Sequence, residues 1–315
     1  MNSLATTEDR PTQKRVDMAE ELRRRVSPRT IIRPNEPLAR RTTLRVGGPA
    51  DLYLEPVSTE ELGAVIRFCS EQNLRLLLLG RGSNLLIKDG GFRGVVICLS
   101  QPQFGLIEVA GEHLSCGAGA RLKAVAVEAK RRGLAGLEFL EGIPGSVGGA
   151  LRMNAGAMGE EIFKVMVSIR LMDEHGRVEE RTRPEMDVQY RSCPMLKTRI
   201  ALGAVLRGHT DDPQLIAQRM DAFSRKRWDS QPAAPSAGCI FKNPSTIPAG
   251  KLVDELGLKG TRVGGAFVSA EHGNFIVNDG TARAQDVLEL IELIRSRARA
   301  QRGIDLETEV EIVGD

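Results

Sequence analysis

The stretch Leu79-Gly80-Arg81-Gly82-Ser83-Asn84-Leu85-Leu86 ends an apolar run that begins at Leu76 and predicts a β-strand. Its two glycines fall where this strand ends and the chain must turn sharply. Glycine lacks a Cβ, so backbone N–H groups in such a turn can approach an anionic oxygen, while Ser83 and Asn84 add hydroxyl and amide donors. The stretch therefore predicts a loop that binds a diphosphate.

A second glycine-rich run, Gly142-Ile143-Pro144-Gly145-Ser146-Val147-Gly148-Gly149-Ala150, lies further along the chain. Neither run fits the common nucleotide-binding motifs. Counting from Gly80, the dinucleotide fingerprint would need a third small residue where Leu85 stands, and no glycine-rich loop closes with Gly-Lys-Ser/Thr. A single loop of this kind can equally be a tight turn between strands. Two loops with polar donors favour a phosphorylated cofactor.

Composition points to an ordinary enzyme of two or three domains. The 315 residues carry a net charge of +3, with Lys and Arg scattered among Asp and Glu, which indicates no nucleic-acid surface. No signal-peptide core or membrane-length apolar run is found, so we expect a cytoplasmic protein that does not insert into membranes. The cysteines are odd in number and lack paired metal-ligand spacing, which predicts free thiols and no metal site. They are Cys69, Cys98, Cys116, Cys193 and Cys239.

Apolar periodicity predicts mainly strands up to residue 210 and a helix-rich segment after it. We expect disorder over about 1–16 and a short helix over 16–26. Strands are expected at 51–55, 76–79, 95–99, 165–172, 177–182, 200–206, 274–278 and 307–313, with a hairpin or strand pair within 105–118. Helices are expected at 58–69, 122–133, 211–228, 251–256 and 284–301. The change of character after His209 places a domain boundary at 211.

Several further motifs carry a family resemblance that runs from about Pro37 to the C-terminus. With the two loops, their order and spacing resemble the UDP-N-acetylenolpyruvoylglucosamine reductase family, flavoenzymes of peptidoglycan precursor synthesis. The chain resembles the shorter subtype, because it runs from Pro244 directly into the next helix and has no tyrosine after Tyr190. The motifs are residues 41–50 (Arg-Thr-Thr-Leu-Arg-Val-Gly-Gly-Pro-Ala), 154–157 (Asn-Ala-Gly-Ala), 190–191 (Tyr-Arg), 237–244 (Ala-Gly-Cys-Ile-Phe-Lys-Asn-Pro) and 307–310 (Glu-Thr-Glu-Val).

The resemblance implies an α+β fold. A flavin-binding part of the PCMH or vanillyl-alcohol-oxidase type would span 37–210, in two subdomains of roughly 37–103 and 104–210. Residues 1–36 would be a charged N-terminal segment. A C-terminal α/β substrate-binding domain would span 211–315, with a final strand that carries Glu309. The oligomeric state is not predicted.

The resemblance also implies FAD as the cofactor and NADPH as the co-substrate. We expect FAD to be non-covalent, because His113, His175, His209 and His272 lie outside both loops. The implied FAD-binding residues are Thr43, Gly47, Gly80, Arg81, Gly82, Ser83, Asn84, Pro144, Gly145, Ser146 and Gly149.

The implied substrate is UDP-N-acetylglucosamine enolpyruvate. NADPH would reduce FAD, which would deliver hydride to the terminal vinyl carbon and leave an enolate beside the carboxylate. That charge needs a fixed cation or donor, and the carbon needs an acid. The resemblance assigns stabilisation to Arg191 and Glu309, protonation to Cys239, and substrate binding to Tyr190, Lys242 and Asn243.

Each catalytic assignment has a plainer alternative. Many relatives have serine where this chain has Cys239, and a cysteine can also be just a small buried residue. A thiol is nevertheless a stronger acid than an alcohol, with a reference pKa of roughly 8.5 that a neighbouring cation can tune. Arg191 could be a surface arginine. Glu309 could face outward with Glu307 and Glu311, because alternate residues of a strand share one face.

Two other functions stay open on the sequence alone. A flavin oxidase or dehydrogenase of the same superfamily would bind FAD without NADPH-driven turnover of the enolpyruvyl sugar. A non-catalytic descendant would bind UDP-sugars or a cell-wall protein. Loss of Arg191 or Glu309 would have favoured the second, but the chain retains both.

Overall fold

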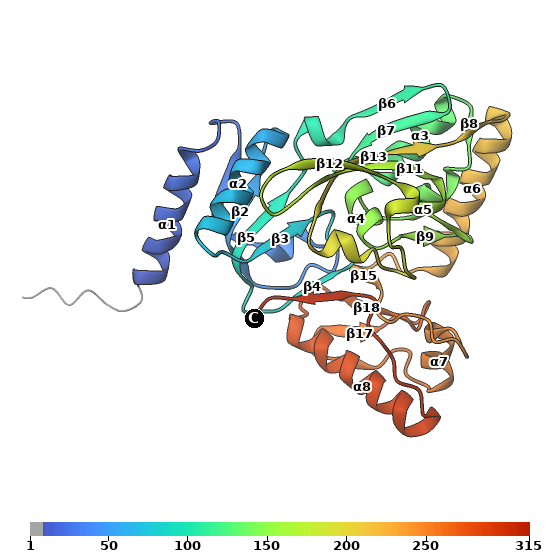
Figure 1. The fold of residues 1–315 in the computed structure, drawn as a ribbon. Coiled ribbons are helices and arrows are strands. Elements are labelled where there is room, and N and C mark those ends of the chain that lie inside the picture. The colour runs from blue at the N-terminus through green and yellow to red at the C-terminus, as the bar shows by residue number, and fades with distance from the viewer. Residues whose placement is uncertain (1–8) are drawn as a thin grey trace, which may run out of the picture.

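The three larger β-sheets of the described chain, with four, five and four strands, each have helices beside them, and the first two lie above the third in the view of Figure 1. The computed structural model describes the backbone of residues 9–315 and the side chains of residues 15–315. The fold is α+β, as predicted. Of the disorder expected over about 1–16, residues 1–8 lie outside the described residues, and the expectation is wrong for 9–16, which belong to a helix. Helix α1 spans Asp9–Arg23 and so begins earlier than predicted.

The first sheet has the order β1-β2-β5-β3. Strands β2, β5 and β3 are parallel, and β1 pairs antiparallel with β2. Because parallel strands end at the same edge, the turn after β3 lies beside the ends of β2 and β5. Helix α2 begins after Ser58, whose side chain accepts a hydrogen bond from Glu61 N, as a helix N-cap does. The bounds are β1 Ile31–Pro37, β2 Pro49–Glu55, α2 Thr59–Glu71, β3 Leu76–Leu79 and β5 Phe92–Cys98.

The second sheet is antiparallel, with the order β12-β11-β13-β7-β6. The two predicted hairpins form its two sides. Helices α3, α4 and α5 and the two-stranded pairs β8–β14 and β9–β10 surround it. The bounds are β6 Ile107–Ala110, β7 His113–Gly117, α3 Leu122–Arg131, β8 Leu134–Ala135, α4 Val147–Arg152, β9 Gly156–Ala157, β10 Glu160–Glu161, α5 Ile162–Val165, β11 Met166–Met172, β12 Val178–Thr182, β13 Ile200–Arg207 and β14 His209–Thr210.

Helix α6 (Pro213–Ser230) follows the predicted domain boundary. It packs against α3 and β8, which lie beside the second sheet. Its buried Ile216 and Met220 belong to the same apolar cluster as Leu122 and Leu137, and the helix lies beside α3 at the right of Figure 1. The third sheet begins after α6, with a strand that starts at Ser236. The division of the chain at 211 stays a prediction.

The third sheet has the order β15-β18-β17-β16 and packs against helix α8. The last strand, β19, does not join this sheet. It pairs parallel with β4, the strand that follows the first glycine-rich loop. The bounds are β4 Leu85–Ile87, β15 Ser236–Cys239, α7 Ala249–Glu255, β16 Arg262–Val263, β17 Ala266–Val268, β18 Phe275–Asn278, α8 Ala284–Arg302 and β19 Glu311–Val313.

The predicted final strand over 307–313 is therefore too long, and Glu309 is not inside it. Residues before Glu311 bond instead to the segment after β15: Glu309 N donates to Ile240 O at 2.8 Å, and Lys242 N donates to Glu307 O at 2.9 Å. Glu309 lies in the extended segment that joins the third sheet to β19. This crossing brings it to the first glycine-rich loop.

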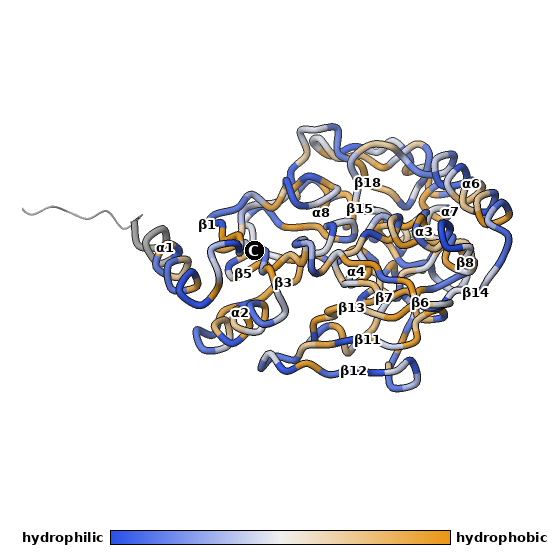
Figure 2. Tube along the Cα trace, turned by 90° about the horizontal axis from the view of Figure 1, so that it is seen from above, coloured by the Kyte–Doolittle hydropathy of each residue, from blue (hydrophilic) through white to orange (hydrophobic). Residues whose placement is uncertain are grey.

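One buried apolar cluster joins the first two sheets, and another fills the space between α8 and the third sheet. In Figure 2 the tube is orange along much of β3 and β13 and blue in the surface loops. Within residues 9–315, no helix is long and apolar enough to span a membrane.

Candidate functional site

The two glycine-rich loops face each other. Ser83 Oγ donates a hydrogen bond to Pro144 O at 2.6 Å, which ties the first loop directly to the second. A Cβ added at Gly80 would lie only 3.0 Å from Ser146 Oγ. Gly82 has a φ of +63°, and its added Cβ would lie 2.4 Å from Arg41 O, so both conformation and space require glycine there.

The second loop is held by the segment before α3 and by the start of α4. Leu122 N donates to Gly145 O at 3.2 Å, and Val147 N donates to Ala120 O at 2.9 Å. Ser146 is the N-cap of α4 and accepts from Gly149 N. The loop is therefore part of a rigid frame.

A cavity of about 280 Å³ opens between the loops, and all three predicted catalytic residues line it. Arg191 lies between β12 and β13, Cys239 ends β15, and Glu309 precedes β19. From the two loops, its walls include Gly80, Arg81, Gly82, Ser83, Asn84, Pro144, Gly145, Ser146 and Gly149.

Arg191 occupies a tight turn. Gln189 and Ser192 exchange two backbone hydrogen bonds, which leaves Tyr190 and Arg191 at the tip, and Arg191 has a φ of +55°. Left-handed backbone is uncommon for a residue with a side chain and costs free energy. Arg191 Nε lies 3.2 Å from Glu309 Oε1. The guanidinium also stacks over the ring of Tyr190, 5.3 Å from its centroid.

Burial dominates the electrostatics of Cys239. It raises the pKa of the thiol to about 12, Glu309 adds to the rise, and Arg191 and Asn274 oppose it. The tuning by a neighbouring cation that the sequence allowed is therefore outweighed by desolvation. Burial likewise raises the pKa of Glu309, against the opposing effects of Arg191 and Lys242. At neutral pH the thiol holds its proton.

A larger cavity of about 830 Å³ adjoins the first and shares Gly80, Arg81 and Ser83 with it. Thr43, a predicted cofactor residue, lines this cavity, and its hydroxyl donates to Ser236 O at 2.7 Å. The walls carry five arginines and a single carboxylate residue, Glu55. Among residues 15–315, whose side chains the structure describes, none forms an ion pair with Arg40, Arg45 or Arg81, whereas the charge of Glu141 acts on Arg227. Unpaired cations beside glycine-rich turns fit the diphosphate of FAD.

Four predicted residues do not line either cavity. Gly47 packs against β4, where its added Cβ would lie 2.5 Å from Ile87 Cβ. Tyr190 is half exposed at its turn. Lys242 forms an ion pair of 2.5 Å with Glu307, and Asn243 Oδ1 accepts from Ala249 N at the start of α7.

Sequence reasoning missed several residues that line the cavities. Phe275 and Gln231 border both of them, and Arg45 and Arg227 add charge to the larger one. Phe275 lies on a buried strand and reads as an ordinary core residue. Arg227 lies in the last turn of α6, where a basic residue is common in any helix. No local pattern distinguishes either residue.

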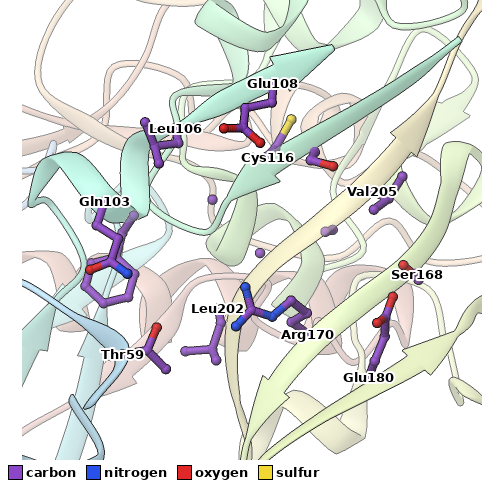
Figure 3. A pocket seen from close by; sticks show the side chains of 15 residues that line it. Thr59, Gln103, Leu106, Glu108, Cys116, Ser168, Arg170, Glu180, Leu202 and Val205 are labelled. Atoms are coloured by element: carbon purple, nitrogen blue, oxygen red, sulfur yellow. The ribbon is translucent and has the colours of Figure 1, made fainter. Parts of the chain in front are cut away.

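A separate cavity of about 320 Å³ lies on the outer face of the second sheet. Figure 3 shows Arg170 and Glu180 there, from the paired strands β11 and β12, with Gln103 and Thr59 at the edge. None of the predicted site residues lines it. Among residues 9–315, no group of three or more His, Cys, Asp or Glu residues could hold a metal ion, and all five cysteines are free.

Two family models match the chain. Residues 50–181 match the FAD binding domain, and residues 231–313 match the UDP-N-acetylenolpyruvoylglucosamine reductase C-terminal domain. These ranges include the first loop and Cys239, respectively, and Glu309 lies within the second range.

Relatives with curated names match over most of the chain. The UDP-N-acetylenolpyruvoylglucosamine reductase of Bacillus subtilis (strain 168) is 43% identical over 285 residues, which cover 89% of this chain and 93% of that protein. The protein of the same name from Carboxydothermus hydrogenoformans is 42% identical and covers 95% of this chain and 98% of its own length. The crystal structure of UDP-N-acetylenolpyruvylglucosamine reductase from Thermus caldophilus has a TM-score of 0.79, at 38% identity, and covers 91% of this chain and 99% of that one.

Proposed function

The chain belongs to the UDP-N-acetylenolpyruvoylglucosamine reductase family, and on that premise we propose that it reduces UDP-N-acetylglucosamine enolpyruvate to UDP-N-acetylmuramate in peptidoglycan precursor synthesis. The observation that carries the proposal is the convergence of Arg191, Cys239 and Glu309 on one cavity between the glycine-rich loops. The two glycine-rich loops would hold FAD, whose chemistry there would be the transfer of hydride from NADPH to the terminal vinyl carbon of the substrate.

The loops and the arginine-lined cavity would hold FAD without a covalent bond. Gly80, Gly82, Gly145 and Gly149 allow the backbone to approach the diphosphate, and Arg81 supplies positive charge. The side-chain donors of Ser83 and Asn84 contribute differently from the prediction, because they bond to Pro144 O and Glu309 O. We propose that these two residues shape the loop, while its backbone contacts the phosphates.

Arg191 and Glu309 would act on the charge that develops as hydride arrives. Negative charge spreads over the carboxylate and the adjacent carbon, and the Arg191 guanidinium, held beside Glu309, would stabilise it. The pair is preorganised: Arg191 is fixed in its turn, and Glu309 N is bonded to Ile240 O. Fixed charges need little reorganisation during the reaction.

Cys239 would supply the proton to the carbon next to the carboxylate. Its raised pKa keeps the thiol protonated at neutral pH, as a general acid requires. One hydride and one proton add across the double bond, and the resulting thiolate recovers a proton from solvent. Arg191, which opposes the rise of the thiol pKa, would stabilise that thiolate.

Tyr190, Lys242 and Asn243 would bind the substrate outside the reacting centre. Lys242 must exchange its Glu307 partner for a phosphate, and the exposure of Glu307 makes that exchange inexpensive. We further propose a flavin-binding part over 37–210, a substrate-binding part over 211–315, and a cytoplasmic location, where the NADPH would be available.

Anaerobic stopped-flow absorbance of the FAD-loaded protein tests the proposal. NADPH should bleach the flavin band, and UDP-N-acetylglucosamine enolpyruvate should then restore it. Bleaching without recovery would contradict the proposed acceptor and favour another flavin-dependent reaction. Absence of a flavin band after reconstitution with FAD would contradict the assignment of the loops.

A further inference from the structure

The Asn154-Ala155-Gly156-Ala157 motif lies directly behind the turn that carries Arg191. Asn154 is buried, with 2% of its surface exposed. Its Nδ2 donates to Gln189 O at 3.3 Å and to Glu161 Oε2 at 2.9 Å. Gln189 is one of the two residues whose backbone bonds close the Arg191 turn. One amide group therefore holds the base of that turn.

The orientation of this amide is determined by its neighbours. A carbonyl oxygen and a carboxylate oxygen can only accept hydrogen bonds, so the amide nitrogen, with its two hydrogens, must face them. Both hydrogens are then used. Within residues 15–315, no group hydrogen-bonds to the buried Asn154 Oδ1. Asn154 also has a φ of +40°, a conformation that asparagine tolerates better than most residues.

The β9–β10 hairpin brings Glu161 to Asn154. Gly156 and Glu161 are paired across the hairpin, and Ile162 N donates to Ala155 O at 3.0 Å. A Cβ added at Gly156 would lie 3.2 Å from Arg191 Nη1 and 2.5 Å from Glu160 O. The motif therefore contacts Arg191 at two levels, at the base of its turn through Asn154 and at the guanidinium through Gly156.

We propose that Asn154, with Glu161 as its partner, is a positioning residue that fixes the Arg191 guanidinium beside Glu309 for sugar reduction. This inference rests on the proposed role of Arg191. Asn154 does not line the cavity, so it acts through the turn and makes no contact with the substrate.

Asn154→Asp is the most direct test, because aspartate has the same shape and also tolerates left-handed backbone. It replaces both hydrogen-bond donors with an acceptor that faces Gln189 O and the Glu161 carboxylate. We expect the rate of flavin reoxidation by the sugar to fall roughly 10- to 100-fold, as small misplacements of reacting groups do. FAD content and flavin reduction by NADPH should be unchanged. Asn73→Asp is the matched control, since Asn73 has a φ of +49° in an exposed turn remote from the site.

A double-mutant cycle with Arg191→Lys separates positioning from a general structural effect. If Asn154 acts through Arg191, Asn154→Asp should cost much less in the Arg191→Lys background, roughly threefold or less. The pH profile is a second readout. The introduced carboxyl group and Glu161 would share a proton as the pH falls, which relieves the repulsion between them, so the single variant should regain activity in acid relative to the wild type.

Equal losses in the wild-type and Arg191→Lys backgrounds would overturn the inference, as would loss of FAD or of NADPH reduction in Asn154→Asp. A failure of the proposed function is distinguishable from these results. It would appear as no reoxidation of the flavin by the sugar in the wild-type protein, whereas normal sugar reduction by Arg191→Lys would contradict only the role of Arg191.

Discussion

Asn84 Nδ2 donates a hydrogen bond of 3.0 Å to Glu309 O, so a residue of the first glycine-rich loop holds the backbone of the proposed catalytic carboxylate. A second hydrogen bond joins the same two segments: Glu311 N donates to Asn84 O at 3.1 Å, where β19 begins its pairing with β4. The cofactor loop and the end of the chain are one structural unit. Distortion of this loop should therefore affect both cofactor binding and the position of Glu309.

The first prediction concerns the proton donor. Cys239→Ser should keep measurable sugar reduction, because a hydroxyl can occupy the same place and donate a proton. Cys239→Ala should still allow NADPH to reduce FAD but should stall reoxidation by the sugar, with a loss of about 10²-fold or more, as expected when general-acid catalysis is removed. Stopped-flow measurement of the two half-reactions would separate these outcomes. Normal turnover of the alanine variant would exclude Cys239 as the donor.

The second prediction concerns the raised pKa of Cys239. With a pKa of about 12, roughly 0.3% of the thiol would be ionised at pH 9.5, against roughly 90% for a free cysteine. Alkylation by iodoacetamide should stay slow from pH 7 to 9.5 in the native protein, as measured at the Cys239 peptide by mass spectrometry. Glu309 raises this pKa and Arg191 lowers it. Glu309→Gln should therefore speed alkylation at pH 9.5, and Arg191→Gln should slow it.

An inflection of the native alkylation rate near pH 8.5 would contradict the burial of the thiol. Alkylation rates equal to the wild-type rate in both variants would show that neither charge acts on Cys239. Peptides that contain Cys69 and Cys116 provide an internal control, because burial raises the pKa of both thiols to about 12.

Most regular elements were predictable because their signals are local. Leu76–Leu79 is apolar and is followed by a glycine, and the pair of Ser58 and Glu61 predicts the start of α2. Tertiary pairing decided what the sequence could not. Glu309 reads as part of a long strand, but residues before Glu311 bond to the Ile240–Lys242 segment, and only Glu311–Val313 joins β4. No local pattern encodes a partner that lies so far away in the chain.

The site was predictable to a similar extent. Both glycine-rich loops were found from their composition, whereas Arg191, Cys239 and Glu309 were assigned through family resemblance. Their convergence depends on the long crossing of the C-terminal segment, which no spacing reveals. Lys242 shows a second limit. Its ion pair with Glu307 forms between segments that meet only in the folded chain, so a solvated lysine and a paired one look alike in the sequence.

The third prediction concerns Gly82. Alanine there would adopt a left-handed φ and place its Cβ 2.4 Å from Arg41 O, so the loop must move. We expect Gly82→Ala to lower the free energy of unfolding by about 1–3 kcal/mol, the usual cost of strained backbone, and to weaken FAD binding. Gly105→Ala is the matched control, because no atom lies within 4 Å of its added Cβ. Urea unfolding and flavin titration measure both effects, and equal behaviour of the two variants would contradict the steric argument.

The last prediction concerns acid stability and starts from His272. Burial, followed by the charge of Lys259, lowers the pKa of this imidazole below its usual 6.5. His272 Nδ1 accepts a hydrogen bond from Asn274 N at 3.1 Å, and Asn274 in turn bonds to both the N–H and the carbonyl of Phe241, two residues after Cys239. Protonation of Nδ1 would remove the acceptor of the Asn274 N–H.

The sign of the pH effect follows from the direction of the shift. Because the folded pKa is below the unfolded one, the unfolded state binds the proton first as the pH falls. The stabilising contribution of neutral His272 is therefore complete above about pH 6.5 and is lost as the pH falls through the folded pKa. One proton changes the free energy of unfolding by at most about 1.4 kcal/mol per pH unit. Urea unfolding between pH 7.5 and 5 should give a shallower pH slope for His272→Gln than for the wild type. Identical slopes for the two proteins would exclude His272 as the titrating group.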